Sequence, residues 1–326
     1  MEKQPLVSII TPCYNGGKFL RKYFDSIMSQ TYSNMELIFI NDGSTDDTEE
    51  IALSYKARLE EKGIKFTYIY QENAGQAVAV NRGLKLFNGD YLTWPDSDDW
   101  MPYDMIEKQV EYLSKHKEKG FVLNKCYYIS DEDFTTVIRE RTRENKDNGN
   151  IFRDLIMNRD VYWGAGAVMV RSTCFLEMNP TRSIFEGKSG QNWQMLLPIS
   201  YKYECGFLDY PIYNILSRKG SHSRSFKTAG EMYEYISKNE ETVLQTLVRI
   251  DMPDEERAAY NRLTKYEHAK KRFYLAVEFN DRDGIRSFYR DVRKYGAITM
   301  KLRVQYAIFK SKILSKIYTL LKKHED

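Results

Sequence analysis

The 326-residue chain contains few cysteines, and none lies close to another in the sequence. Cys13, Cys126, Cys174 and Cys205 form no CxxC pair, so the sequence indicates neither a zinc cage nor a disulfide framework. Four reduced thiols are usual in a large intracellular protein. We therefore expect the four cysteines to be free thiols.

Long apolar runs are also absent. No stretch reaches the roughly 18 uninterrupted apolar residues of a membrane span, and residues 1–5 lead into a strand-like segment without a signal-peptide apolar region. Charge of one sign is not in excess either, since 49 Lys and Arg against 46 Asp and Glu give a net charge of +3. We predict a cytoplasmic protein without a nucleic-acid partner.

Several catalytic motifs are missing from the chain. There is no P-loop, no G-x-S-x-G elbow and no H-E-x-x-H, and Gly164-Ala165-Gly166 lacks the third glycine of a dinucleotide fingerprint. What is present is an ordinary globular composition, 42% hydrophobic and 29% charged, with 25 Tyr and 16 Phe. The length predicts about two domains, at roughly 100–200 residues each.

In the first third of the chain, short apolar runs alternate with amphipathic helical patterns. The strands are expected at 6–10, 35–40, 64–70 and 90–94, and the helices at 19–28 and 74–87. Such alternation predicts βαβ units and a mostly parallel sheet, with ligands bound outside the carboxyl ends of the strands. Further strands are expected at 120–130, 161–171 and 204–216, a helix near 191–201, and only helices beyond about residue 228.

The C-terminal segment 296–323 carries seven Lys or Arg residues and no acid. Its apolar residues recur at steps of three and four and form one stripe: Ile298, Leu302, Tyr306, Phe309, Ile313, Ile317 and Leu320. A basic amphipathic helix of this kind suits an anionic membrane surface, and it equally suits packing on the catalytic domain or on a second subunit. Peripheral membrane association and a homodimer therefore both stay open.

Two polar clusters follow the first two strands. In residues 11–17, Tyr14 is able to stack on a flat ligand such as a base, although the cluster alone is typical of a strand-to-helix turn. In residues 41–48, Ser44 or Thr45 suits the cap of the next helix. Asp42 is not needed as a cap, so its carboxylate is free to accept a hydrogen bond from a base.

A third cluster, Asp96-Ser97-Asp98-Asp99, follows the fourth strand. Carboxylates this close repel one another unless a cation offsets their charge. Oxygen ligands and sparse protein coordination suit Mg²⁺ or Mn²⁺, which takes phosphate oxygens and water as its other ligands. A solvated acidic turn is the alternative.

The order and spacing of the three clusters resemble those of family 2 glycosyltransferases, which are inverting enzymes with the GT-A fold. The matching stretches are residues 7–15, 29–32, 36–46, 73–75, 81–83, 89–92 and 96–99. The resemblance implies an α/β fold: a GT-A type αβα sandwich with a mostly parallel nucleotide-binding sheet and a C-terminal all-helical region. We expect a glycosyltransferase domain at 1–225, divided into a nucleotide-sugar half at 1–115 and an acceptor half at 116–225. The helical region is expected at 226–326.

The resemblance also implies the chemistry. The enzyme is expected to transfer a sugar from a nucleoside diphosphate-sugar, with UDP as the expected nucleotide, to a glycan or lipid-linked glycan in surface polysaccharide synthesis. A Mn²⁺ or Mg²⁺ ion is expected on Asp96 and Asp98, with Asp99 beside the donor sugar. The residues expected around the nucleotide-sugar are Thr11, Pro12, Tyr14, Asn15, Asp42, Gly75, Asn81, Arg82 and Asp96.

The acceptor half departs from the family pattern. Where the family usually has a Glu-Asp pair at the start of a helix, this chain has Gln191-Asn192, and amides cannot accept a proton at neutral pH. Glu186 is the candidate general base, or an ordinary surface glutamate. Trp193 is expected either to stack on an acceptor sugar or to lie in the core.

His222 resembles a late histidine of the family that lies near the metal and diphosphate, and an ordinary surface histidine is the alternative. Two other functions stay open at this point. A nucleotidyltransferase would want a Gly-rich, basic loop after the first strand, which the chain lacks. A nucleotide-sugar or glycan-binding protein without catalytic activity would explain the missing acidic pair.

Overall fold

The computed structural model describes residues 4–162, 164–187, 190–218, 226, 228–311 and 313–314. Their contacts divide the chain into two compact units, Met1–His222 and Ser223–Asp326. The boundary expected near residue 225 stays a prediction, because residues 219–225 lie outside the described part of the chain.

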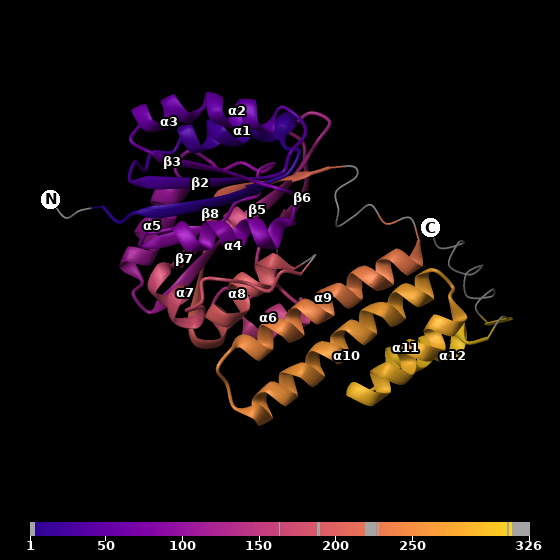
Figure 1. The fold of residues 1–326 in the computed structure, drawn as a ribbon. Coiled ribbons are helices and arrows are strands. Elements are labelled where there is room, and N and C mark those ends of the chain that lie inside the picture. The colour runs from indigo at the N-terminus through magenta and orange to yellow at the C-terminus, as the bar shows by residue number, and fades with distance from the viewer. Residues whose placement is uncertain are drawn as a thin grey trace. The chain divides into compact units, whose positions relative to one another are not determined.

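The first unit is built from eight strands and eight α-helices within the described residues (Figure 1). The strands are β1 (Val7–Cys13), β2 (Met35–Asp42), β3 (Lys65–Gln71), β4 (Tyr91–Thr93), β5 (Lys119–Ser130), β6 (Val137–Arg141), β7 (Val168–Arg171) and β8 (Glu204–Ser217). The helices are α1 (Gly17–Met28), α2 (Thr48–Ser54), α3 (Lys56–Glu61), α4 (Gln76–Leu86), α5 (Met105–Lys115), α6 (Phe152–Met157), α7 (Ser172–Met178) and α8 (Gln191–Lys202).

All eight strands belong to one sheet, ordered β3-β2-β1-β4-β7-β5-β6, with β8 paired to β5. Strands β1 to β4 are parallel, and β7 joins the sheet antiparallel to both β4 and β5. The chain runs outward from β1 to β3 and then returns to place β4 on the other side of β1. The carboxyl ends of β1 and β4 therefore form the switch point where such sheets bind ligands.

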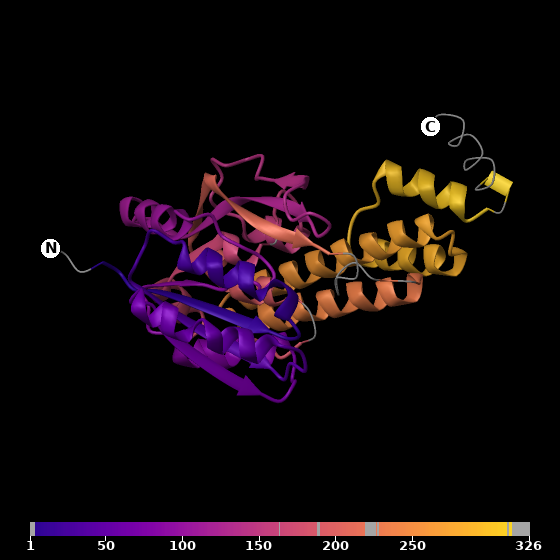
Figure 2. The same ribbon diagram turned by 90° about the horizontal axis from the view of Figure 1, so that it is seen from above.

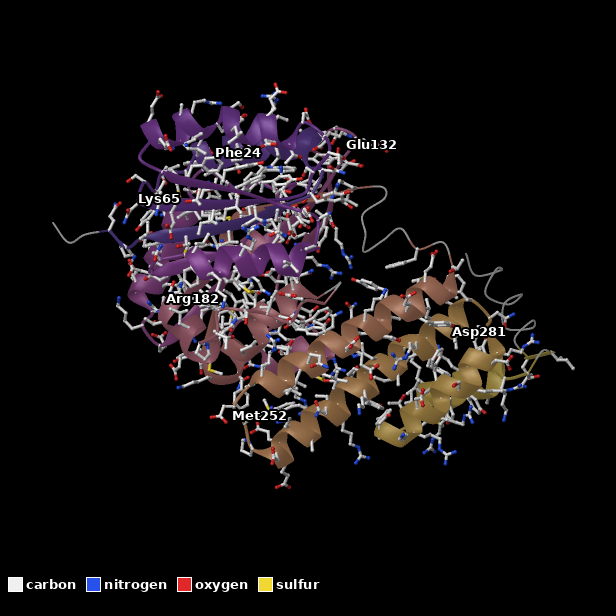
Figure 3. The ribbon with its side chains drawn as sticks, viewed as in Figure 1. Phe24, Lys65, Glu132, Arg182, Met252 and Asp281 are labelled. Atoms are coloured by element: carbon white, nitrogen blue, oxygen red, sulfur yellow. The ribbon has the colours of Figure 1, made fainter. Side chains whose placement is uncertain are left out.

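Helices cover both faces of the parallel strands, with α1 to α3 on one face and α4 on the other (Figure 1). The apolar residues of α1 recur at helical spacing and are buried, which is why this segment forms a helix against the sheet. Phe24 of α1 stacks on Tyr55 with ring centroids 4.8 Å apart and meets Phe66 of β3 edge-on (Figure 3). The structure confirms the expected α/β fold.

One expected strand is wrong in its first half. Residues 165–167 form a 3₁₀ turn, η1 (Ala165–Ala167), and only β7 is extended. A Cβ atom at Gly166 would lie 2.5 Å from the ring of Tyr213, so the turn packs more tightly on β8 than a side chain allows. The strand β6 is not among the strands expected from the sequence. The other expected strands agree with the structure to within one to three residues.

The second unit contains four helices in its described residues: α9 (Ala229–Arg249), α10 (Asp254–Glu278), α11 (Arg282–Tyr295) and α12 (Met300–Phe309). Helices α9 and α10 run side by side (Figure 2) and are joined by the Arg272–Glu240 ion pair at 2.6 Å. Asp281 caps α11 by accepting from the Gly284 N–H at 3.0 Å and also accepts from the Tyr233 hydroxyl (Figure 3). These contacts join α9 to α10 and to the start of α11.

The first half of the C-terminal stripe is packed inside this helical unit. Leu302 is fully buried and Phe309 nearly so, in one cluster with Phe273 of α10 and Val292 of α11. The Tyr306 ring stacks on Tyr289 with centroids 3.9 Å apart. Up to Phe309 the stripe therefore packs on helices of its own unit, a partner that the sequence analysis did not name, and association with a membrane or a second subunit stays a prediction. Among the described helices, none is long and apolar enough to cross a membrane.

Candidate active site

The loops that follow β1 and β2 are joined by side chain–backbone hydrogen bonds. The Asn15 N–H donates to Ser44 Oγ at 2.9 Å, and the Thr45 N–H donates to Asn15 Oδ1 at 2.8 Å. The Gly17 N–H donates to Asp46 Oδ2 at 2.9 Å. Ser44 and Thr45 thus join two loops and do not cap α2, which begins without a side-chain cap.

Asp42 ends β2 and organises the loop after β3. Its buried carboxylate accepts from the Gln71 side-chain amide at 2.6 Å, and from the Ala74 and Gly75 N–H groups at 2.9 Å each. Gly75 has a φ of +96°, a conformation that favours glycine, and α4 begins directly after it. The residue expected to bind the base therefore also shapes the loop that is expected to border the donor.

The expected base-stacking residues differ in exposure. Tyr14 is 50% exposed at the carboxyl end of β1, so its ring is available to a ligand. Thr11 is fully buried and its hydroxyl is hydrogen-bonded to Tyr23, while Pro12 is also buried. Thr11 and Pro12 are therefore part of the core under the site. Of the three residues, only Tyr14 is exposed and available to contact a ligand.

The acidic turn lies at the carboxyl end of β4. Asp98 Oδ2 is 2.6 Å from Arg218 Nη2, and Asp96 Oδ1 accepts from the Gln76 side chain of α4 at 3.0 Å. Burial and the neighbouring negative charge of Asp98 raise the pKa of Asp96 to about 7, although Gln76 and Arg218 act in the opposite direction. Gln76 and Arg218 thus only partly offset the effects of burial and of Asp98 on Asp96.

Asp99 faces inward, in contrast to Asp96 and Asp98. It is 3% exposed, and its Oδ1 accepts from the Leu216 N–H of β8 at 2.9 Å. Burial, followed by the charges of Asp98 and Asp96, raises the pKa of Asp99 well above its usual range. The structure therefore gives Asp99 an internal partner, and its expected place beside the donor sugar stays a prediction.

The two outer carboxylates fit a divalent ion of the Mg²⁺ or Mn²⁺ type. Within the described residues, no three His, Cys, Asp or Glu side chains gather into a complete metal cage. These ions usually take only one or two protein carboxylates and complete their shell with phosphate oxygens and water. Asp96 and Asp98 lie two residues apart on this turn, so a bound cation would offset the repulsion between them.

Two side-chain amides hold the loop that carries Glu186. Asn81 of α4 accepts from the Ile184 N–H at 2.7 Å and donates both to the Ile184 carbonyl and to Glu186 Oε1, the latter at 3.2 Å. The Gln194 side chain of α8 likewise accepts a hydrogen bond from the Phe185 N–H and donates one to the Phe185 carbonyl. The exposed Glu186 is therefore fixed beside α4, and Asn81 uses its amide to position this loop.

The start of α8 holds the residues that replace the family's acidic pair. Asn192 Oδ1 accepts from the Trp94 indole N–H at 3.0 Å, which ties α8 to the residue after β4. Gln191 is half-buried at the first position of the helix. Trp193 is 9% exposed and its indole N–H donates to the Leu155 carbonyl, so it lies in the core and not on an acceptor surface.

The structure thus brings most of the expected residues to the carboxyl edge of the sheet. Arg82 is exposed on α4 and donates to the Tyr70 carbonyl at 3.4 Å. His222 lies outside the described residues. Sequence reasoning did not assign Gln76, Gln194 or Arg218, and only Arg218 had a signal, as a basic residue directly after a strand-like segment.

An α/β sheet with a switch point between β1 and β4 and an acidic turn at that edge defines a nucleotide-binding class of fold. The family model for glycosyl transferase family 2 matches residues 8–174, about half of the chain. The chain belongs to this family.

Relatives that are named as glycosyltransferases match the chain over part of their length. An uncharacterized glycosyltransferase of Rickettsia typhi is 43% identical over 128 residues, which are 39% of this chain and 38% of the relative. Glycosyltransferase GlyA of Streptococcus pneumoniae is 44% identical over 110 residues, 32% of this chain and 15% of the relative. The chain thus spans well under half of the curated relatives it matches.

Solved structures resemble a much larger part of the chain. S. aureus TarS 1–349 in complex with UDP-GlcNAc superposes with a TM-score of 0.66 at 17% identity, covering 96% of this chain and 91% of that 1–349 chain. The mannosyltransferase PcManGT of Pyrobaculum calidifontis, in complex with GDP-Man and Mn²⁺, has a TM-score of 0.54 at 16% identity and covers 99% and 89%. At these identities the likeness shows the GT-A fold.

Proposed function

We propose that this chain is an inverting glycosyltransferase that transfers a sugar from a nucleoside diphosphate-sugar to a hydroxyl group of a glycan or lipid-linked glycan. The observation that carries the proposal is that Tyr14, Asp42 and the acidic turn all lie at the carboxyl ends of the adjacent strands β1, β2 and β4, beside the switch point of the sheet. UDP is the proposed nucleotide, which the TarS complexes with UDP-GlcNAc and UDP support. A role in surface polysaccharide synthesis is part of the same proposal.

The proposed donor site uses residues from three strand ends. Tyr14 supplies an exposed ring for the base, and Asp42, at the end of β2, holds the Gly75 loop that would enclose the base. Asp96 and Asp98 would hold Mn²⁺ or Mg²⁺. When bound, the ion would offset the negative charge that develops on the departing nucleoside diphosphate.

Glu186 is the proposed general base. Its carboxylate would take the proton of the acceptor hydroxyl as the hydroxyl oxygen bonds to the anomeric carbon and the bond to the diphosphate oxygen breaks. Support comes from the two amides, Asn81 and Gln194, that fix the 184–186 loop. A base must be held in place to act efficiently, and an ordinary surface glutamate needs no such clamp.

The test is a transfer assay with a panel of UDP-sugars, Mn²⁺ and glycan acceptors, in which UDP release and the anomeric configuration of the product are measured. We expect UDP release from one donor and an inverted product. Glu186→Gln should lower kcat about 10²- to 10⁴-fold, the usual contribution of a general base, and leave the affinity for UDP unchanged.

Glu61→Gln is the matched control, because Glu61 is an exposed glutamate on α3. It should behave as the wild type in the same assay. A Glu186→Gln variant with wild-type kcat would remove Glu186 as the base. UDP binding without any hydrolysis or transfer across the panel would favour a non-catalytic binding protein instead.

A further inference from the structure

Arg218 is the basic side chain that meets the acidic turn in the described structure. Its guanidinium lies 2.6 Å from Asp98 Oδ2, with the Arg218 side chain 36% and the Asp98 side chain 19% exposed. Arg218 therefore neutralises part of the charge that a divalent ion would neutralise.

The position of Arg218 is fixed by the strand that precedes it. Asp99 accepts from the Leu216 N–H, and Trp100 and Asn214 exchange two backbone hydrogen bonds of 3.1 and 3.2 Å. The end of β8 is thus tied to the residues that directly follow Asp98. The guanidinium also lies 5.0 Å from the centre of the buried Phe19 ring, a favourable cation–π distance.

We propose that Arg218 is the resident counter-ion of Asp98 and competes with the divalent ion for this carboxylate. Without nucleotide, the guanidinium holds Asp98 and weakens binding of the ion. When a nucleoside diphosphate is present, its negative charges attract both cations, and Arg218 is free to leave Asp98 for a phosphate oxygen. The ion then binds together with the nucleotide and only weakly before it.

The physical basis is the repulsion between like charges at short range. A guanidinium a few ångströms from a divalent cation opposes its binding, and the effect is large where water is partly excluded. When a diphosphate is bound, Arg218 no longer opposes binding of the ion, because arginine binds phosphate oxygens well through its planar fork of N–H groups. The inference rests on the proposed function, since it concerns the same donor site.

The experiment is a titration with Mn²⁺, in which free and bound ion are separated by electron paramagnetic resonance, in the absence and presence of UDP. Arg218→Gln removes the charge, and Arg218→Lys keeps the charge without the planar fork. Arg58→Gln is the matched control, since Arg58 is exposed on α3 and pairs with Asp25 away from the acidic turn. Thermal unfolding checks that each variant is folded.

Without UDP, we expect Arg218→Gln to bind Mn²⁺ about tenfold more tightly than the wild type, equivalent to about 1.4 kcal/mol. Arg218→Lys should show a smaller increase, and Arg58→Gln none. With UDP, the advantage of Arg218→Gln should shrink or reverse. Equal Mn²⁺ affinity of wild type and Arg218→Gln without UDP would overturn the inference.

The same titration separates this inference from the proposed function. If UDP binds but neither the wild type nor any variant binds Mn²⁺, with or without UDP, the proposed competition is disproved. The proposed nucleotide site is then still supported. If UDP does not bind at all, the proposed function fails. The comparison of Mn²⁺ affinities without UDP still decides the role of Arg218 in that case.

Discussion

The strand ends of the first unit and the helices of the second unit use their polar and apolar residues in different ways. At the strand ends, Asn15, Asp42 and Asp46 bind backbone groups of neighbouring loops, so each polar side chain has a specific partner. In the helical unit, the stripe residues Leu302 and Phe309 are buried in a general apolar cluster. A polar motif at a strand end therefore allows its role to be predicted from sequence. An amphipathic stripe does not, because it fits several partners equally well.

The largest expected effect comes from the acidic turn. Asp98→Asn removes one proposed metal ligand and the ion pair with Arg218, and it should lower turnover on the order of a thousandfold. Stability should change little, because the pair is partly exposed and the substitution relieves repulsion from Asp96. Steady-state UDP release and thermal unfolding measure the two effects.

Asp47→Asn serves as the control for Asp98→Asn, because Asp47 is exposed on the loop before α2 and makes no side-chain capping bond. It should retain wild-type turnover. Near-wild-type turnover of Asp98→Asn with the correct donor would contradict the proposal that Asp98 binds the divalent ion. It would also contradict a catalytic role for the turn after β4.

The next effect tests the packing of the helical stripe. Leu302→Ala opens a cavity in the cluster of Phe273 and Val292 and should lower the free energy of unfolding by about 2–5 kcal/mol. Val304→Ala on the same helix is the control, because Val304 is 48% exposed and should change stability by less than about 0.5 kcal/mol. Urea denaturation followed by circular dichroism compares them, and equal stabilities would mean that α12 does not pack here.

A smaller effect should follow from pH in the same unit. Burial, followed by the charge of Lys271, lowers the pKa of His268 to about 3, although the Thr264 carbonyl opposes the shift. Because the unfolded state binds the proton at about pH 6.5, stability is full above that pH and falls as the pH drops toward 3. Between pH 8 and pH 5 the loss should be about 2 kcal/mol.

His268→Gln should abolish most of this pH dependence, whatever its effect on stability at pH 8. His116→Gln, at a half-buried histidine of the first unit, should leave the dependence unchanged. The measurement is the free energy of unfolding from urea denaturation at both pH values. An unchanged pH dependence in His268→Gln would show that His268 is not buried in its neutral form.

The smallest expected effect concerns the membrane. Lys301, Arg303 and Lys310 are exposed on or beside α12, while the apolar residues between them are partly used in packing. We propose weak peripheral binding to anionic vesicles, on the order of 1 kcal/mol per cation near the surface and lost at high salt. Sedimentation with anionic and neutral vesicles tests this, and binding that ignores lipid charge would refute it.

Much of the first half of the fold could be predicted from sequence, because strands β1 to β4 and the loops that follow them lie within one continuous stretch. Contacts over long sequence separation could not be predicted. The Asp98–Arg218 pair joins residues 120 positions apart, and the clamp of Asn81 on Ile184 spans 103. The 3₁₀ turn at 165–167 likewise depends on close packing against Tyr213, which no local pattern reports.

The central claim is that the carboxyl ends of β1, β2 and β4 bind a nucleoside diphosphate. The direct measurement is a calorimetric titration of wild type, Asp42→Asn and Asp47→Asn with UDP, without metal and then with Mn²⁺. The wild type should bind UDP, and Asp42→Asn should bind it at least about tenfold more weakly even without metal, as expected for the loss of a charged hydrogen-bond acceptor. Asp47→Asn should match the wild type. Absence of UDP binding by the wild type, or unchanged affinity in Asp42→Asn, would contradict the claim.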